Sequence, residues 1–164
     1  MTRRTYATDE IEVGWDASLC IHTARCLKAA PEVFDVHRRP WVVPDAGSAE
    51  EVIGAVAKCP TGALTVRRIG DVDPAEALPE LPNVMLVPNG PLMIRGQVEI
   101  VQPDGTVVRR SSRVTLCRCG ASENKPYCDA SHRRIGFSTA DEAPEPEPLP
   151  RVPEAERESP ADCG

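Results

Sequence analysis

The 164-residue sequence predicts a small α+β protein of two domains followed by an acidic tail. Short strand-like segments alternate with helical patterning over residues 1–69, whereas strand-like segments and turns dominate residues 84–140. Between them, residues 70–83, "GDVDPAEALPELPN", interrupt the apolar pattern with prolines and acids, as a linker does. Each domain is so short that its hydrophobic core is marginal. A bound metal would therefore support folding as well as chemistry.

The first domain, residues 1–69, is predicted to follow a β/α/β/α/β order. Its clearest helix is "SAEEVIGAVAKC", in which Ser48 and Glu51 form a capping box and apolar residues recur on one face. Trp15 and Trp41 are predicted to pack in the small core of this domain. The predicted strands are "IEVGW", "WVV" and "LTVRR".

The second domain, residues 84–140, is predicted to be rich in β-structure. Its turn "PDGT", residues 103–106, joins two of the segments as a hairpin. The last segment leads directly into Cys117, so that "CRC" continues the extended geometry. The predicted strand segments are "VMLV", "LMIRGQVEIV", "TVVR" and "RVTL".

The chain has a formal net charge of −6, and the tail carries all of it. Residues 141–164 contain eight acids, two arginines and six prolines, a composition that predicts disorder. Residues 1–83 hold nine bases and thirteen acids, against eight and four in residues 84–140. The arginines of the second half could form a basic face for an acidic partner or for the first domain itself: Arg109, Arg110, Arg113, Arg118, Arg133 and Arg134.

Several classes of function are disfavoured by what the sequence lacks. No apolar run approaches the roughly 18 residues of a spanning helix, and no export signal is recognisable, so a cytoplasmic protein is expected. The basic residues have no aromatic stacking companions, which argues against nucleic-acid binding. No catalytic triad, phosphate-binding glycine loop or pair of acids stands out. We therefore expect no independent catalytic site.

The segment "CRCGASENKPYCDASH", residues 117–132, concentrates metal-binding side chains. In an extended segment Cys117 and Cys119 point to the same side, and on a helical turn Cys128 and His132 share a face. Asp129 can cap free backbone N–H groups beside them. Three thiolates and one imidazole suit either a zinc ion or a [2Fe-2S] cluster, and the tight CxC spacing favours the cluster.

This pattern, CxCxxSxxxPxCDxSH, resembles the signature of the CDGSH (mitoNEET-like) iron-sulfur family over roughly residues 84–140. The resemblance implies a [2Fe-2S] cluster bound by Cys117, Cys119, Cys128 and His132, and it raises the option of a homodimer formed through this domain. Ala130 stands where the family usually has glycine, so the loop could be reshaped. An imidazole ligand would raise the potential and make the cluster sensitive to pH.

The first domain carries a second cysteine set, Cys20, Cys26 and Cys59. Aligned to the ferredoxin pattern CxxCxxCxxxCP, Cys20 and Cys26 take the first and third positions and Thr23 the second, while Cys59-Pro60 supplies the distant ligand. The segments "CIH", "PEVFD", "RRPWV" and "CPTGAL" resemble the divergent single-cluster ferredoxins over roughly residues 6–68. Three thiolates fit a [3Fe-4S] cluster, and a [4Fe-4S] cluster fits if water, hydroxide, Thr23 or His22 completes it.

The expected function is single-electron transfer by a protein with two iron-sulfur clusters and a redox partner protein. The alternative is a cluster carrier or redox and pH sensor that releases its [2Fe-2S] unit to an apo-acceptor through His132. A third reading makes the second domain a zinc-stabilised docking module. Cys163, in the tail, is expected to be a free thiol.

Overall fold

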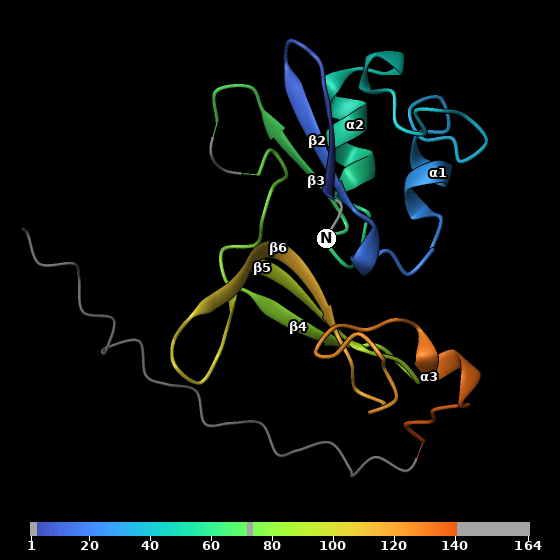
Figure 1. Cartoon of the computed structure of the whole chain (residues 1–164), viewed down its shortest axis with the longest axis vertical. Helices are drawn as coiled ribbons and strands as arrows, with labels where there is room; N and C mark the ends of the chain where they lie inside the picture. The colour runs from blue at the N-terminus through green and yellow to red at the C-terminus, as the bar shows by residue number, and fades with distance from the viewer. Residues whose placement is uncertain (1–2, 72–73, 141–164) are drawn as a thin grey trace, which may run out of the picture.

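The computed structural model describes residues 3–71 and 74–140 and shows two small three-stranded antiparallel sheets with few helices (Figure 1). The predicted disordered tail lies outside these residues. The molecule is thus a small mixed α+β protein. The helices and strands run in the order β1 (Arg3–Ala7), β2 (Ile11–Asp16), a 3₁₀ helix (Ala17–Leu19), α1 (Arg25–Ala29), a 3₁₀ helix (Pro44–Ala46), α2 (Ala49–Val56), β3 (Leu64–Arg68), β4 (Asn83–Leu86), β5 (Leu92–Val101), β6 (Val107–Leu116) and α3 (Ser131–Arg134).

The first sheet has the order β1-β2-β3, with β2 in the centre. Alternate residues of β2 and β3 are buried and face α2, as the period of two in a half-buried strand requires. The capping box of α2 is confirmed, since the Ser48 hydroxyl accepts the Glu51 N–H while the Glu51 carboxylate accepts the Ser48 N–H. The core of this domain is Ile11, Val13, Ala30, Val33, Phe34, Val42, Ala49, Val52, Ala55, Val56, Leu64 and Val66.

The predicted β/α/β/α/β order of the first domain is wrong in two places. The segment "WVV" is not a strand, because Val42 makes only an isolated bridge with Phe34. An extra strand, β1, precedes β2 and pairs with it from Arg3 to Ala7. The resulting order is β-β-α-α-β. Val42 is buried in the core although it belongs to no sheet, because its side chain enters the core from a loop.

The second sheet has the order β4-β5-β6, and "TVVR", from its second residue on, and "RVTL" are parts of the single long strand β6. The predicted hairpin between β5 and β6 is present, with Gly105 at a φ of 84° in its turn. Only Val114 and Cys128 of the buried hydrophobic residues in the described chain belong to this domain. Its own core is therefore very small.

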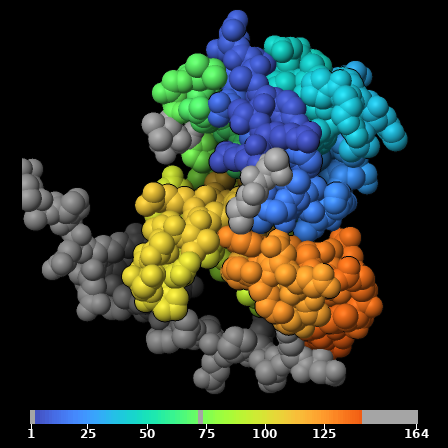
Figure 2. Space-filling model, viewed as in Figure 1, coloured from blue at the N-terminus to red at the C-terminus, as the bar shows by residue number. Residues whose placement is uncertain are grey.

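The two domains contact each other through β6 and through the loop that follows it (Figures 1 and 2). Four consecutive residues of β6, from Ser112 to Thr115, are buried, so both faces of the strand are covered at this point. Asn124 of the second domain donates a hydrogen bond to the Ser18 carbonyl of the first, at 2.8 Å. Within the described part of the chain, no helix is long and apolar enough to cross a membrane.

Candidate metal centres

The three cysteines of the first domain line one cavity. Cys20 follows the 3₁₀ helix Ala17–Leu19, Cys26 lies in the first turn of α1, and Cys59 follows the end of α2. His22 and Ala24 have φ angles of 53° and 55°, and these left-handed residues bend the loop between the first two cysteines. The fold thus brings together three side chains that are up to 39 positions apart in the sequence.

The thiols of this cavity influence one another electrostatically. Burial raises the pKa of Cys20 and of Cys26, and the neighbouring Cys59 raises both further. Thiolates that line one cavity repel one another, and a positively charged metal group would relieve that repulsion. The donor set therefore fits a group of several iron atoms held by thiolates.

Other side chains at the same cavity add polar contacts. His22 and Thr23 line it, and the His22 Nδ1 lies 3.9 Å from the Cys20 sulfur. Trp15 and Trp41 also line it, and the indole N–H of each is buried without a hydrogen-bond partner in the structure. An unpartnered buried donor is uncommon and here agrees with an acceptor, such as a cluster sulfur, filling the cavity. The two indole rings also pack against each other, 5.0 Å apart.

The second set of donors lies on the loop after β6 and on α3. The sulfurs of Cys117 and Cys119 are 3.9 Å apart, and the Cys128 sulfur lies 3.6 Å from the His132 Nδ1. Cys128 lies before α3 and not within it, and Ala130 at the N-terminus of that helix has a φ of 69°. The left-handed turn at Ala130, not a continuous helix, brings Cys128 and His132 together.

Backbone donors support this loop. The Ala130 N–H donates to the Cys128 sulfur at 3.3 Å, and the Asp129 carboxylate accepts the Ser131 and Glu123 N–H groups at 2.9 Å each. The Ser131 hydroxyl and these two N–H groups hold the pKa of Asp129 well below its usual range. The carboxylate is therefore charged at neutral pH and closes the loop that carries the donors.

The pKa values of two thiols of the second site are shifted in opposite directions. Burial raises the pKa of Cys128, and the charges of Asp129, Cys117 and Cys119 raise it further, although the Ala130 N–H opposes them. Burial alone would also raise the pKa of Cys117. The N–H groups of Ser122 and Gly120, with help from Cys119 and the Lys125 ammonium, outweigh burial and lower it.

His132 is half-buried, and its pKa is lowered by burial and by the neighbouring Arg133 charge. Its imidazole is consequently neutral at neutral pH, which is the form that binds metal. Among residues 3–71 and 74–140, no three Cys, His, Asp or Glu side chains gather as the ligands of one metal ion would. The assignment of the seven residues as cluster ligands stays a prediction of the sequence, supported by the chemistry of the two donor sets.

Each of the two donor sets lies within a segment that matches a known family. Residues 6–69 match the family model described as a divergent 4Fe-4S mono-cluster. Over 64 residues, or 39% of this chain, the sequence is 31% identical to an uncharacterized protein, YjdI, of Escherichia coli strain K12, of which 84% is covered. A protein of the same name in Escherichia coli O157:H7 matches equally. The chain belongs to the divergent 4Fe-4S mono-cluster family.

In this family member the first domain is followed by a second one. Residues 89–133 match the model of an iron-binding zinc finger of CDGSH type, so the fusion predicted from the sequence is confirmed. Both are iron-binding descriptions, and the protein is accordingly an iron-sulfur protein. Buried polar residues lie between the two domains. Arg113, one of the arginines predicted to serve an acidic partner or the first domain itself, is buried with 2% of its surface exposed and donates a hydrogen bond to the Leu64 carbonyl of the first domain.

Proposed function

We propose that this divergent mono-cluster protein binds a [3Fe-4S] or [4Fe-4S] cluster at Cys20, Cys26 and Cys59 and a [2Fe-2S] cluster at Cys117, Cys119, Cys128 and His132, and that it transfers single electrons between a low-potential donor and a redox enzyme. The clusters would supply the one-electron chemistry. The observation that carries the proposal is that one short chain holds both donor sets on domains in direct contact. We place the protein in the cytoplasm and assign it no catalytic site of its own.

The test is metal analysis of the protein purified without oxygen. Iron, sulfide and zinc are measured per chain, together with EPR spectra before and after dithionite reduction. We expect about five irons with a [3Fe-4S] first cluster or about six with a [4Fe-4S] one, and no zinc. A signal in the oxidised protein would identify [3Fe-4S].

Two variants assign the iron to its sites. Cys26→Ser should remove the first cluster and leave about two irons, whereas Cys119→Ser should remove the [2Fe-2S] iron only. Stoichiometric zinc in the unaltered protein would instead support the zinc-stabilised docking module. About two irons per chain in the unaltered protein would indicate a single cluster and would contradict the two-cluster proposal.

A second candidate function is delivery of the [2Fe-2S] cluster to an apo-acceptor. It is favoured by the position of His132, which lines an open surface hollow together with Val87, Asn89 and Phe137. A neutral imidazole at the surface is a replaceable ligand, because protons compete with iron for its nitrogen.

The variant His132→Cys separates the two candidates. A thiolate in place of imidazole should lower the reduction potential and slow cluster transfer several-fold, while one-electron reduction continues. The first measurement is the reduction potential of the cluster, followed by its reduced-minus-oxidised spectrum. The second is the rate at which an apo-ferredoxin acquires the cluster. Transfer at the unaltered rate would eliminate the carrier function.

A further inference from the structure

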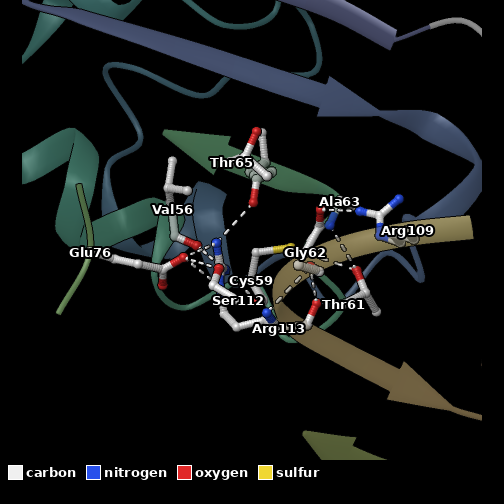
Figure 3. A network of polar contacts seen from close by, with 12 residues as sticks. Val56, Cys59, Thr61, Gly62, Ala63, Thr65, Glu76, Arg109, Ser112 and Arg113 are labelled. Atoms are coloured by element: carbon white, nitrogen blue, oxygen red, sulfur yellow. Dashed lines mark hydrogen bonds and ion pairs between the residues drawn. The ribbon is translucent and has the colours of Figure 1, made fainter. Parts of the chain in front are cut away.

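The loop that carries Cys59 is bound by the second domain (Figure 3). The Arg113 guanidinium of β6 donates hydrogen bonds to the carbonyls of Val56, Cys59 and Leu64, the last at 2.9 Å. Arginine suits this task because its planar group carries five fixed donors. Its charge is balanced by Glu76 at 2.9 Å, which also accepts the Ser112 hydroxyl at 2.7 Å.

Two residues further along β6, Thr115 contacts the backbone of both donor sets. Its buried hydroxyl donates to the carbonyl of Pro60, the residue after Cys59, at 2.7 Å. Its own carbonyl accepts the N–H of Cys128 at 2.9 Å. Thr115 is therefore bonded to the residue next to one predicted ligand and to the backbone of another.

The close approach of the loop to β6 requires a glycine at position 62. Gly62 has a φ of 68°, and a Cβ on it would lie 2.5 Å from the Arg113 carbonyl oxygen. The Gly62 carbonyl also accepts a hydrogen bond from Arg109 at 3.2 Å. The segment from Val56 to Leu64 is thus fixed at five carbonyls by three side chains of β6: Arg109, Arg113 and Thr115.

We propose that β6 of the second domain positions Cys59, through Arg113 at its own carbonyl and through Thr115 at the next residue, so that docking of the two domains holds the first metal centre in place. The inference rests on the proposed first cluster. Its physical basis is that Cys59 follows the last turn of α2 on a loop, and each bond to β6 removes conformations in which its sulfur points elsewhere. Here β6 fixes the loop of one donor set and continues into the other.

The test compares Thr115→Val with Thr115→Ser in the full-length protein. Valine keeps the shape of threonine and its backbone carbonyl, so only the bond to Pro60 is lost, whereas serine retains the hydroxyl. Ser112→Ala is the matched control, since it removes a buried hydroxyl bond of the same strand to Glu76 and not to the Cys59 loop.

The measurement is the rate of iron loss from each centre when the purified protein is mixed with an iron chelator. Samples are taken at intervals, and EPR spectra before and after dithionite reduction follow the two clusters separately. Thr115→Val should release first-centre iron roughly five- to tenfold faster, equivalent to the roughly 1 to 1.4 kcal/mol of one buried hydrogen bond. The second centre, Thr115→Ser and Ser112→Ala should stay near the unaltered rates.

A second readout does not depend on metal. In the iron-free protein, amide hydrogen exchange over residues 56–62 should be faster in Thr115→Val than in Ser112→Ala. Gly62→Ala disturbs the same contact between the Cys59 loop and β6 from the first-domain side. It should also speed iron loss from the first centre. Gly105→Ala is its control, since Gly105 has a φ of 84° but no atom within 4 Å of the added Cβ.

Each outcome has one meaning. Unchanged iron loss in Thr115→Val and Gly62→Ala, or equal acceleration in Ser112→Ala, would overturn the positioning role while leaving the proposed clusters intact. An unaltered protein without iron at Cys20, Cys26 and Cys59 would overturn the proposed function itself. Selective loss from the first centre, with rescue by serine, would establish that β6 positions Cys59.

Discussion

At the scale of single residues, Ala130 shows how the second donor set is shaped. Its Cβ does not prevent the tight turn, because the residue adopts a φ of 69° and still donates its N–H to Cys128. A left-handed conformation costs a residue with a Cβ roughly 1 to 2 kcal/mol relative to glycine. The loop is thus formed as a glycine would form it, at the cost of backbone strain.

We predict that Ala130→Gly stabilises the protein by about 1 kcal/mol. Glycine adopts a positive φ without strain, and its greater conformational entropy in the unfolded chain offsets part of that gain. The measurement is urea unfolding followed by circular dichroism. Ala57→Gly is the control, since Ala57 has a φ of −59° at the end of α2, and glycine there should reduce stability. A lower unfolding midpoint for Ala130→Gly would contradict the strain argument.

At the scale of elements, strand β4 is the most exposed part of the second sheet. All four of its residues are exposed, with Val84, Met85 and Leu86 at 57%, 59% and 61%. β4 is an edge strand, paired with β5 alone among the described strands. An apolar edge with unpaired backbone groups is a template for another strand. A second copy of β4 would bury the apolar side chains and form hydrogen bonds with the unpaired backbone groups.

We therefore propose a homodimer formed through β4. Size-exclusion chromatography with light scattering should give twice the chain mass for the unaltered protein, and Met85→Glu should shift it to the monomer by placing a charge in the interface. Ile69→Glu adds the same charge at an exposed residue of the first domain and should leave the dimer unchanged. A monomer at all concentrations of unaltered protein would exclude this interface.

At the scale of the whole molecule, polar contacts hold the two domains together. The only buried ion pair among the described residues is Arg113–Glu76, with Glu76 contributed by the predicted linker. A second pair, Arg109–Asp16 at 3.5 Å, joins β6 to the end of β2. Part of the predicted basic face thus serves the first domain itself. Because each bond depends on a fixed partner, the polar junction sets one orientation, which an apolar patch would define less sharply.

The sequence by itself determined the features that depend on neighbours along the chain. The capping box of α2, the hairpin at residues 103–106 and the CDGSH signature of residues 117–132 are short-range patterns, and each is confirmed, as is the match to the mono-cluster family, whose Cys59 lies farther along the chain. Local chemistry fixes such features, since a capping side chain reaches only three residues and a metal signature repeats fixed spacings.

Only the tertiary structure decided what depends on distant partners. The strand β1 has a polar, exposed pattern without a strand signal and forms because β2 offers it an edge. The segment "WVV" has a strand signal, but its pairing is limited to the isolated bridge of Val42 with Phe34. Arg113 resembles any surface arginine in sequence and is buried because three carbonyls of the first domain converge on it. Such roles follow from contacts across some 50 residues, which no local pattern encodes.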